Sequence, residues 1–357
     1  MSTPWRNTAI TERLGLRVPI VLGPFGGASS VELTSTVSNV GGLGSYGLYG
    51  MDADRIGDIG RQLAAATNGP FALNLWLPHG PDPRPSESEY ATFLRILEPY
   101  FDELELVLPE RPDRYLVPFS EQIDATLEAA PAAISFVYGV PDAALVQRCR
   151  TAGILVIGTA TTVAEARALA AGGVDAIVAT GFEAAGHRVS FLAPPHDSLV
   201  GTIALVPRVV DAVDVPVIAA GGIADGRGVA AALALGASAV QLGTAFLACD
   251  ESAANRAHRQ MLWSDAAEET VLTSVFSGRP SRGIPNRMSR ELGDVIDGLA
   301  TFPVQNWLTG HLKRAAAATG NPDFTSLWAG QAAPLITHRH ASELIEDIER
   351  TVDSILG

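Results

Sequence analysis

Eight short apolar segments recur along the first 247 residues, and most of them are followed by an amphipathic, alanine-rich stretch. Most of these segments are nearly continuous hydrophobic runs, which is typical of parallel strands covered on both faces. Strands that alternate with helices predict an α/β fold, and eight repeats favour a closed (β/α)8 TIM barrel. An open doubly wound sheet uses the same alternation, and periodicity alone does not exclude it. The predicted strands span residues 18–23, 43–47, 71–77, 133–139, 154–160, 175–181, 215–222 and 239–246.

The connections between these strands are unequal in length. Residues 78–90 are rich in proline and polar side chains, which indicates a surface loop. The stretch 101–131 is too long for a plain connection. Beyond residue 247 the alternation stops, so we predict a barrel core over residues 1–247 and a smaller, mainly helical region over residues 248–357, which supplies the last barrel helix and a cap over the barrel mouth. The predicted helices between strands span residues 31–40, 52–66, 141–152, 162–171, 199–212 and 225–235.

The composition argues against several classes of protein. A formal net charge of −14 is unfavourable for binding nucleic acid or an anionic membrane surface, since both need clustered lysine and arginine. No apolar run reaches the roughly 18 residues of a spanning helix, and the N-terminus lacks a signal-like segment. The two cysteines are not spaced as metal ligands, so we expect a cytoplasmic protein without a metal site. Lys313 is the only lysine, so Schiff-base chemistry requires that Lys313 itself lines the site.

Glycine or another small residue stands at nearly every predicted strand end. Active sites of parallel barrels form at the carboxyl ends of the strands, and phosphate groups commonly bind at the seventh and eighth. Gly221, Gly222, Gly243 and Thr244 stand near those two ends, and a helix predicted to start near Asp225 adds unpaired N–H donors. Pyridoxal phosphate needs a lysine in the site, and no lysine stands at a predicted strand end. FMN is therefore the favoured cofactor. The alternative is that these glycines only terminate strands.

One histidine occupies such a strand end. His187 follows the sixth predicted strand, within ATGFEAAGHRVSF, on a turn of small residues. Its imidazole is a candidate base or hydrogen-bond donor, and a surface histidine bonded to a neighbouring carbonyl is the alternative. Asn74, at the third strand end, is a candidate partner for a flavin ring edge or, equally, for a neighbouring loop. No histidine pair has zinc-site spacing, and there is no nucleophile elbow.

Seven stretches, in this order, resemble the nitronate monooxygenase family, formerly called 2-nitropropane dioxygenases, over nearly the whole chain. They are VPIVLGPFGG, VSNVGGLGSYG, PFALNLWLP, ISFVYGVP, GFEAAGHRVSF, VPVIAAGGIADGRGVAAALALGASAVQLGTAFLA and TSVFSGRPSRGIPNR. The resemblance implies an FMN-containing barrel with a helical second domain over its mouth, and it places His187 at the catalytic-histidine position. With Gly221 from the strand-end argument, the predicted FMN-binding residues are Gly23, Pro24, Phe25, Asn74, Thr180, Ala185, Gly186, Gly221, Gly222, Gln241, Leu242, Gly243 and Thr244.

The resemblance also implies an activity, the oxidation of small nitronates by O2 to carbonyl compounds and nitrite. A nitronate is already a carbanion equivalent, so His187 either hydrogen-bonds the nitro oxygens or deprotonates a neutral nitroalkane. His187, Arg188 and helix N-termini are the groups expected to attract an anion. Three positions depart from the family pattern: GPFGG replaces PMAGG, Thr180 replaces a frequent glutamine, and Ala185-Gly186 replaces a doubled glycine. These departures leave the identity of the substrate open.

Two other functions fit the same residues. The barrel and the IAAGGIADGRG stretch also resemble flavin-dependent enoyl-ACP reductases, which oxidise NAD(P)H, whereas FSGRPSRGIPNR favours the monooxygenases. The other alternative is an FMN-binding protein without turnover, in which His187 is structural. The sequence leaves open the natural substrate and its pathway, the use of neutral nitroalkanes or NAD(P)H, and the oligomeric state.

Overall fold

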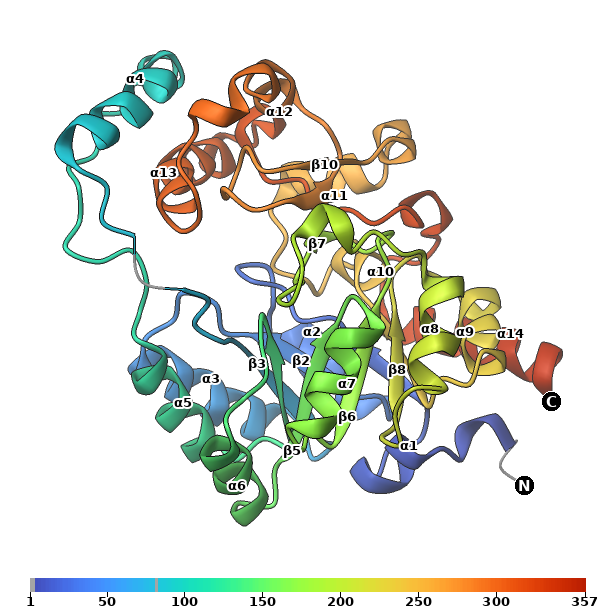
Figure 1. The fold of residues 1–357 in the computed structure, drawn as a ribbon. Helices are drawn as coiled ribbons and strands as arrows, with labels where there is room; N and C mark the ends of the chain where they lie inside the picture. Colours follow the sequence, from blue (N-terminus) through green and yellow to red (C-terminus); the bar gives the residue numbers. More distant parts are fainter. Residues whose placement is uncertain (1–3, 81–82) are drawn as a thin grey trace.

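Eight parallel strands form a ring at the centre of the molecule (Figure 1). The computed structural model describes residues 4–80 and 83–357. The strand order is β1-β9-β8-β6-β5-β4-β3-β2, and a parallel bridge between Val21 and Leu43 joins the two ends of this sheet. The predicted (β/α)8 TIM barrel is confirmed. The strands are β1 (Ile20–Leu22), β2 (Gly44–Gly47), β3 (Phe71–Trp76), β4 (Ala133–Val137), β5 (Leu155–Ala160), β6 (Ala176–Thr180), β8 (Val217–Ala220) and β9 (Ala239–Leu242).

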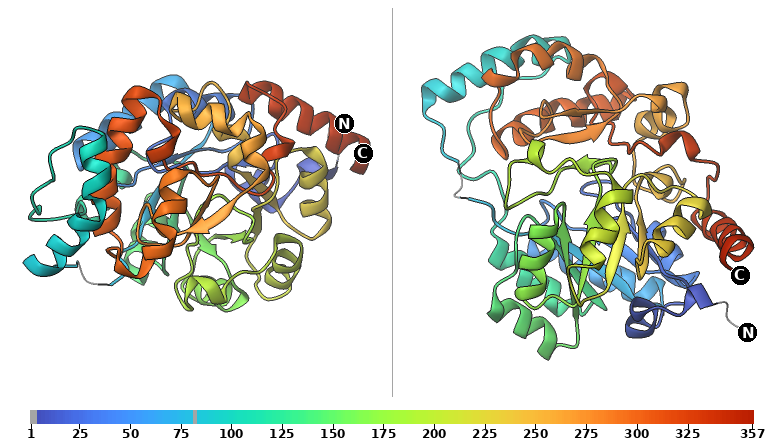
Figure 2. Two further views of the ribbon diagram at one scale, coloured as in Figure 1. Left: turned by 90° about the horizontal axis from the view of Figure 1, so that it is seen from above. Right: turned by 45° about the vertical axis from the view of Figure 1, so that its right-hand side comes forward.

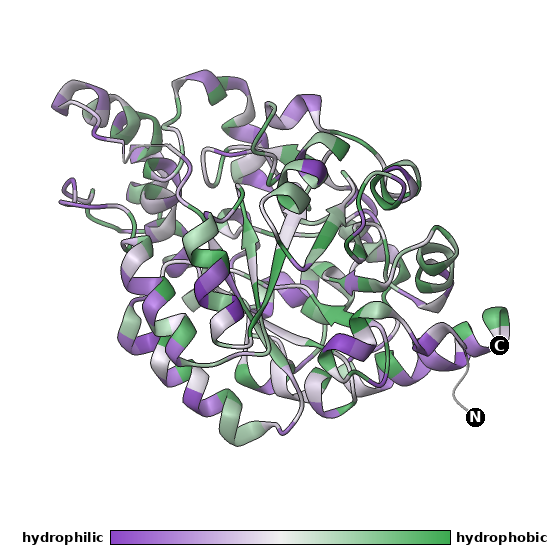
Figure 3. Ribbon diagram, turned by 60° about the horizontal axis from the view of Figure 1, so that its bottom comes forward, coloured by the Kyte–Doolittle hydropathy of each residue, from purple (hydrophilic) through white to green (hydrophobic). Residues whose placement is uncertain are grey.

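Alternate strand residues fill the inside of this ring. Val21, Ile157 and Ile218 belong to one buried hydrophobic cluster, together with Ile10 and Leu14 of helix α1 (Ala9–Leu14). Because successive strand residues point to opposite faces, their neighbours in sequence pack outward against the helices. In Figure 3 the strands are accordingly green or pale, while the surrounding helices carry purple patches.

Most barrel helices begin at a side chain that caps their first N–H groups. Ser30, Asp52, Asp142 and Thr162 each accept a hydrogen bond from the backbone N–H three residues ahead. The predicted helices therefore begin and end within three residues of the observed ones. None of the described helices combines the length and hydrophobicity that crossing a membrane requires. The barrel helices are α2 (Val31–Asn39), α3 (Ala53–Ala66), α5 (Phe119–Glu128), α6 (Ala143–Thr151), α7 (Val163–Ala171), α8 (Thr202–Val210), α9 (Gly226–Ala234) and α14 (Ala341–Leu356), which packs against α9 and α2.

The eighth strand is shorter than the prediction of 239–246. β9 ends at Leu242, and helix α10 (Thr244–Leu247) begins two residues later. Gly243 lies between them with φ −107° and ψ −80°, which fits neither a strand nor a helix. The apolar residues after Gly243 are thus buried in a helix, a case that continuous hydrophobicity does not distinguish from a strand.

Most of the residues between Leu247 and helix α14 form a layer over the carboxyl ends of the strands (Figures 1 and 2). We call it the cap. Besides helices, it contains two strands that the sequence analysis did not predict, β10 (Val271–Thr273) and β11 (Ser281–Gly283). They form an antiparallel sheet with β7 (Gly186–His187), which comes from the barrel half of the chain. The cap helices are α11 (Arg256–Leu262), α12 (Arg287–Glu291) and α13 (Val304–Thr319); the 3-10 segments of the chain are Pro4–Arg6, Pro195–Asp197, Asp265–Glu268, Gly293–Gly298, Pro322–Phe324 and Ala333–Leu335.

Helix α4 (Glu87–Glu103) accounts for part of the long stretch between the third and fourth strands. Its buried Leu97 and Phe101 share a hydrophobic cluster with Leu308 and Phe324 of the cap. Figure 1 shows α4 near α12 and α13, away from the barrel. The predicted surface loop over 78–90 is wrong at its end, because residues 87–90 are the first residues of α4. Its residues 81–82 lie outside the described residues. This insertion packs with the cap.

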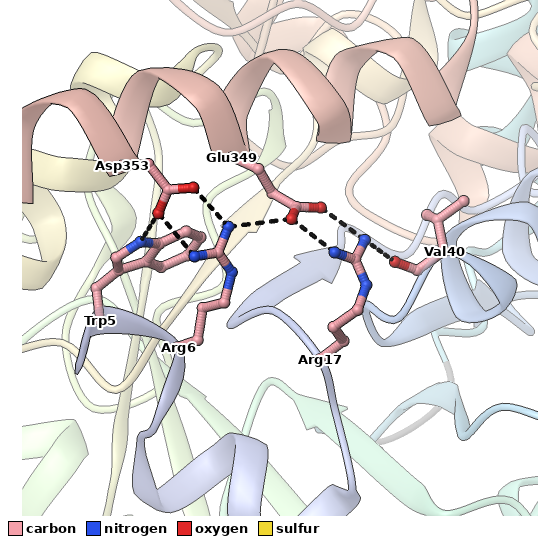
Figure 4. A network of polar contacts seen from close by, with 6 residues as sticks. All are labelled: Trp5, Arg6, Arg17, Val40, Glu349 and Asp353. Atoms are coloured by element: carbon pink, nitrogen blue, oxygen red, sulfur yellow. Dashed lines mark hydrogen bonds and ion pairs between the residues drawn. The ribbon is translucent and has the colours of Figure 1, made fainter. Parts of the chain in front are cut away.

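The start of the described chain is bound to its last helix (Figure 4). Asp353 accepts hydrogen bonds from the Trp5 indole and the Arg6 guanidinium, both at 2.7 Å. Arg17 donates two hydrogen bonds of 2.6 Å to Glu349, which Arg6 also contacts at 3.2 Å. Two arginines and two carboxylates thus connect α14 to the segment that precedes β1.

Candidate active site

His187 lies between the barrel mouth and the cap. It pairs with Ser281 in the cap sheet, so the small-residue turn predicted here is a short strand. Its Nε2 atom lies 2.9 Å from the hydroxyl oxygen of Ser277, whereas Nδ1 has no hydrogen-bond partner among the described residues. The rings of Trp76 and Trp328 lie 5.1 and 5.6 Å from the imidazole, centroid to centroid. The imidazole is therefore held at one nitrogen and unbonded at the other.

The imidazole of His187 is neutral at neutral pH. Burial by the surrounding protein, and then the positive charges of Arg279 and Lys313, lower the pKa of His187 from 6.5 to about 3. Within the described part of the chain, none of these three residues forms an ion pair with a carboxylate. This region is therefore locally positive, although the whole chain has a formal charge of −14.

Aromatic side chains enclose the space beside His187. The ring of Trp76 lies 4.4 Å from Tyr49, 5.0 Å from Tyr138 and 5.7 Å from Phe302. The guanidinium carbon of Arg279 lies 4.2 Å from the centroid of Tyr138 and 4.0 Å from that of Phe302, so two aromatic faces stabilise its charge. The sequence analysis did not predict these residues as part of the site, because nothing in local spacing distinguishes them from core aromatics.

Arg188 is not the anion-binding group that the sequence analysis expected. It is 2% exposed, and its guanidinium donates to the carbonyls of Gly181 at 2.7 Å and Ser198 at 2.9 Å. Burial lowers its pKa to about 10. Its Nη1 and Nη2 groups, which were expected to bind an anion, tie the end of β6 to the loop before α8, while its buried Nε has no hydrogen-bond partner among the described residues. Beside Arg188, a cavity of about 420 Å³ lies between residues 190–195 and 278–280.

A glycine-lined cradle lies where β1 and β9 end. The N–H of Gly23 donates to the carbonyl of Leu242 at 2.8 Å, and a Cβ on Gly23 would lie 3.2 Å from Cα of Gly243. A Cβ on Gly243 would instead meet only Phe25, at 3.8 Å, so open space adjoins this position. The backbone N–H of Gly243 has no hydrogen-bond partner among the described residues. An open space with a free backbone donor fits a phosphate group.

The N-terminus of the helix after β8 has fewer free N–H groups for a phosphate than predicted. The side chain of Asp225 accepts hydrogen bonds from the N–H groups of Arg227 at 3.0 Å and Gly228 at 3.1 Å, so this carboxylate already caps α9. Gly221 and Gly222 remain candidates for contact with a phosphate. Both have positive φ, and the N–H of Gly222 has no partner in the described chain. The backbone of the β8–α9 turn, rather than the helix start, is therefore the available donor.

Asn74 is 4% exposed and donates from Nδ2 to both the carbonyl and the hydroxyl oxygen of Ser135, at 3.1 and 2.9 Å. Its amide nitrogen thus bonds the neighbouring strand β4, and not a neighbouring loop as the alternative had it, while Oδ1 has no partner in the described residues. The hydroxyl of Thr244 accepts a hydrogen bond from the N–H of Gly330 in the cap, at 2.9 Å. Of the other predicted FMN-binding residues, Pro24 follows β1, Thr180 ends β6, and Gln241 and Leu242 end β9. Ala185 precedes β7, and Gly186 is its first residue.

Comparison with known proteins identifies the family. A sequence profile described as nitronate monooxygenase matches residues 7–350. The chain belongs to the nitronate monooxygenase family. A probable nitronate monooxygenase of Staphylococcus saprophyticus is 37% identical over 353 residues, covering 98% of this chain and 99% of that protein. One from Staphylococcus haemolyticus is 35% identical over 354 residues, with 99% of both chains covered. The resemblance stated from the sequence is confirmed.

Solved structures place this family member among oxidoreductases. A nitroalkane oxidase from Streptomyces ansochromogenes is 35% identical, with a TM-score of 0.89 over 97% of this chain and 98% of that one. FabK from Thermotoga maritima is 28% identical, with a TM-score of 0.76 over 98% and 97%. This nitronate monooxygenase family enzyme is thus more similar to the nitroalkane oxidase than to FabK.

Proposed function

We propose that this enzyme binds FMN at the barrel mouth and oxidises small alkyl nitronates with O2 to carbonyl compounds and nitrite. The observation that carries the proposal is a neutral His187 in an aromatic, locally positive site without a paired carboxylate. Such surroundings favour a small anion with an apolar part. The relatives named as probable nitronate monooxygenases and as a nitroalkane oxidase support the same substrate class.

FMN fits the strand ends. The open space beside Gly243 and the unpaired N–H groups of Gly222 and Gly243 would hold its phosphate, and Oδ1 of Asn74 would accept a hydrogen bond from the ring edge. When bound, FMN supplies the electron acceptor that the side chains lack. We propose residues 1–247 as the FMN-binding core and residues 248–357 as the cap region with the last barrel helix. The proposed contacts are Gly23, Pro24, Phe25, Asn74, Thr180, Ala185, Gly186, Gly221, Gly222, Gln241, Leu242, Gly243 and Thr244.

We assign His187 to hydrogen bonding rather than to proton abstraction. A base whose pKa is about 3 is weak at neutral pH, whereas a preformed nitronate has already lost its proton. We propose the tautomer in which Nε2 accepts from the Ser277 hydroxyl, so that the Nδ1–H of His187 is free to donate to a nitro oxygen. His187→Asn should then slow turnover of ethyl nitronate and of nitroethane to a similar degree. A loss confined to nitroethane would instead identify His187 as a base.

Oxygen consumption and nitrite formation test the function directly. We expect both with ethyl nitronate, slower turnover with neutral nitroethane, and none with NADH. Denaturation of the purified protein should release FMN in stoichiometric amount. Protein that contains FMN but forms no nitrite from any of a panel of alkyl nitronates would contradict the proposal, and released FAD would overturn the cofactor assignment.

The second candidate function is that of a flavin-dependent, NAD(P)H-oxidising reductase of the enoyl-ACP class. The similarity to FabK from Thermotoga maritima, at a TM-score of 0.76, favours this candidate. Rapid bleaching of the flavin by NADH without O2 would support it, and no bleaching over many turnover times would exclude it. Failure of both assays in FMN-containing protein would leave flavin binding without turnover.

A further inference from the structure

Lys313, the only lysine of the chain, has few polar partners inside the protein. Its Nζ atom donates to Oδ1 of Asn306 at 2.9 Å, which is its one hydrogen bond among the described residues. An ammonium group has three donors, and Lys313 forms no ion pair in the described part of the chain. The surrounding protein, and secondarily Arg314, lower its pKa to about 8. Lys313 is partly buried, and a partly buried cation with unused donors is stabilised when a ligand completes its environment.

Lys313 is connected to the surroundings of His187. Asn306, which holds its ammonium group, also donates from Nδ2 to the hydroxyl oxygen of Tyr49 at 2.9 Å. The ring of Tyr49 lies 4.4 Å from Trp76, and that of Trp76 lies 5.1 Å from His187. The charge of Lys313 is also one of the causes that lower the pKa of His187.

The two cations that act on His187 differ in their own surroundings. Arg279 lies between two aromatic faces, which stabilise its charge. Lys313 has no aromatic face among the described cation–π contacts and no carboxylate partner. Arg314, its neighbour on α13, is exposed and contacts His311 instead. Of these cations, Lys313 is the one that lacks a compensating group.

We propose that Lys313 is a specificity-determining residue that binds the negatively charged end of the substrate near His187, with Asn306 holding the ammonium group in place. This contact makes the site select anions over neutral molecules of the same shape. The inference rests on the proposed oxidation of nitronates, because a nitronate differs from its parent nitroalkane by one proton and one negative charge. A purely structural Lys313, linking α13 to Tyr49, would affect folding stability without affecting this selection.

Three variants distinguish a Lys313 that binds the substrate anion from a Lys313 that is purely structural. Lys313→Met removes the charge but keeps a long apolar side chain, and Lys313→Arg keeps the charge. Arg314→Met is the matched control, because it removes one positive charge from the next position of the same helix, at an exposed side chain. Thermal unfolding checks that each variant is folded. Lys313→Gln replaces the methionine variant if the latter does not fold.

Binding of inorganic nitrate is measured by calorimetry on the FMN-containing protein, since nitrate is a planar oxyanion that is not a substrate. We expect Lys313→Met to weaken nitrate binding by about 10-fold or more, the usual effect of losing a charge-assisted hydrogen bond. Lys313→Arg should recover most of the affinity, and Arg314→Met should stay within about twofold of the wild type. No nitrate binding by the wild type, or equal binding by wild type and Lys313→Met, would overturn the proposal.

Kinetics give the second readout and distinguish this proposal from the proposed function. In Lys313→Met, the KM for ethyl nitronate should rise by about 10-fold with a smaller change in kcat, while the KM for nitroethane stays near the wild-type value. Equal changes for both substrates would contradict the selection role. If the wild type binds nitrate through Lys313 but oxidises no nitronate, the anion site stands and the proposed function fails.

Discussion

The Nε2 atom of His187 and the hydroxyl oxygen of Ser277 lie 2.9 Å apart, although 90 residues separate them in the chain. His187 follows a barrel strand, and Ser277 lies in the cap between β10 and β11. The Ser277 oxygen also accepts from the N–H of Arg279 at 3.2 Å and lies 3.1 Å from the Arg279 carbonyl. The cap thereby fixes the orientation of an imidazole that the barrel half of the chain supplies.

Removing this contact tests its importance for turnover. Ser277→Ala should lower kcat on ethyl nitronate by about 10-fold, because one hydrogen bond that orients the ring is lost while the FMN site is untouched. Ser281→Ala is the matched control, since the side chain of this buried serine donates, among the described residues, only to the backbone carbonyls of Thr273 and Arg279, and its backbone pairing with His187 is kept. Steady-state kinetics and FMN content are the measurements. Equal losses in the two variants would mean that the segment, and not its contact with His187, sets the rate.

Gly243→Glu should give folded protein that lacks FMN. The backbone of Gly243 has negative φ and a Cβ there meets no atom closer than 3.8 Å, so the substitution causes neither strain nor a clash. A carboxylate at this position would instead occupy and repel the proposed phosphate. Gly243→Ala, which adds one methyl group, is the control and should retain much of the cofactor. Full FMN occupancy in the glutamate variant, read from the absorbance spectrum, would refute the placement of the phosphate.

The affinity for nitronates should decrease above about pH 8. Lys313, whose pKa is about 8, is charged below that pH and loses its proton above it. His187 stays neutral throughout this range, and burial raises the pKa values of Tyr49 and Tyr138 to about 12.

The KM for ethyl nitronate should therefore rise between about pH 8 and 10 in the wild type, because the ammonium charge is lost in that range. It should stay flat in Lys313→Arg. The measurement is initial rates across this pH range with FMN-saturated enzyme. Parallel profiles for wild type and the arginine variant would show that another group titrates.

Glu349→Gln should destabilise the fold. Glu349, with 13% of its side chain exposed, accepts hydrogen bonds from both Arg6 and Arg17 in the network of Figure 4. We expect the free energy of unfolding to fall by about 1 kcal/mol, a modest value because Arg17 is half-exposed to solvent. Arg350→Gln removes an exposed ion pair with Asp347 on the same helix and should cost clearly less. Chemical denaturation of the two variants gives the comparison.

The barrel was predictable from the sequence because its signal is local. Apolar runs such as those of β3 and β5 are buried on both faces, and caps such as Asp52 and Thr162 mark the helix starts. The eighth strand was predicted too long because the chain changes from strand to helix at Gly243 without any change in hydrophobicity. Local pattern thus located the elements better than it located their ends.

The candidate site was less predictable, because it is assembled from distant segments. Strand-end reasoning found His187, but the segment that holds it includes Ser277, which only the FSGRPSRGIPNR resemblance indicated. Arg188 was expected to face an anion, and its guanidinium instead binds carbonyl groups, which no local pattern predicts. The place of Lys313 depends on how α13 packs over the barrel, a relationship that the sequence of the helix does not encode.

Because β7 belongs to the cap sheet, the cap determines the surroundings of the His187 imidazole. His187 is hydrogen-bonded into the cap sheet beside β11, and Gln305 and Thr309 of α13 donate to the carbonyls of Val275 and Phe276 in the adjoining segment. Exchanging the cap between two enzymes of this fold would therefore exchange the surroundings of the histidine as well. A chimaera of this kind would inherit its substrate preference from the donor of the cap, and its cofactor from the donor of the barrel.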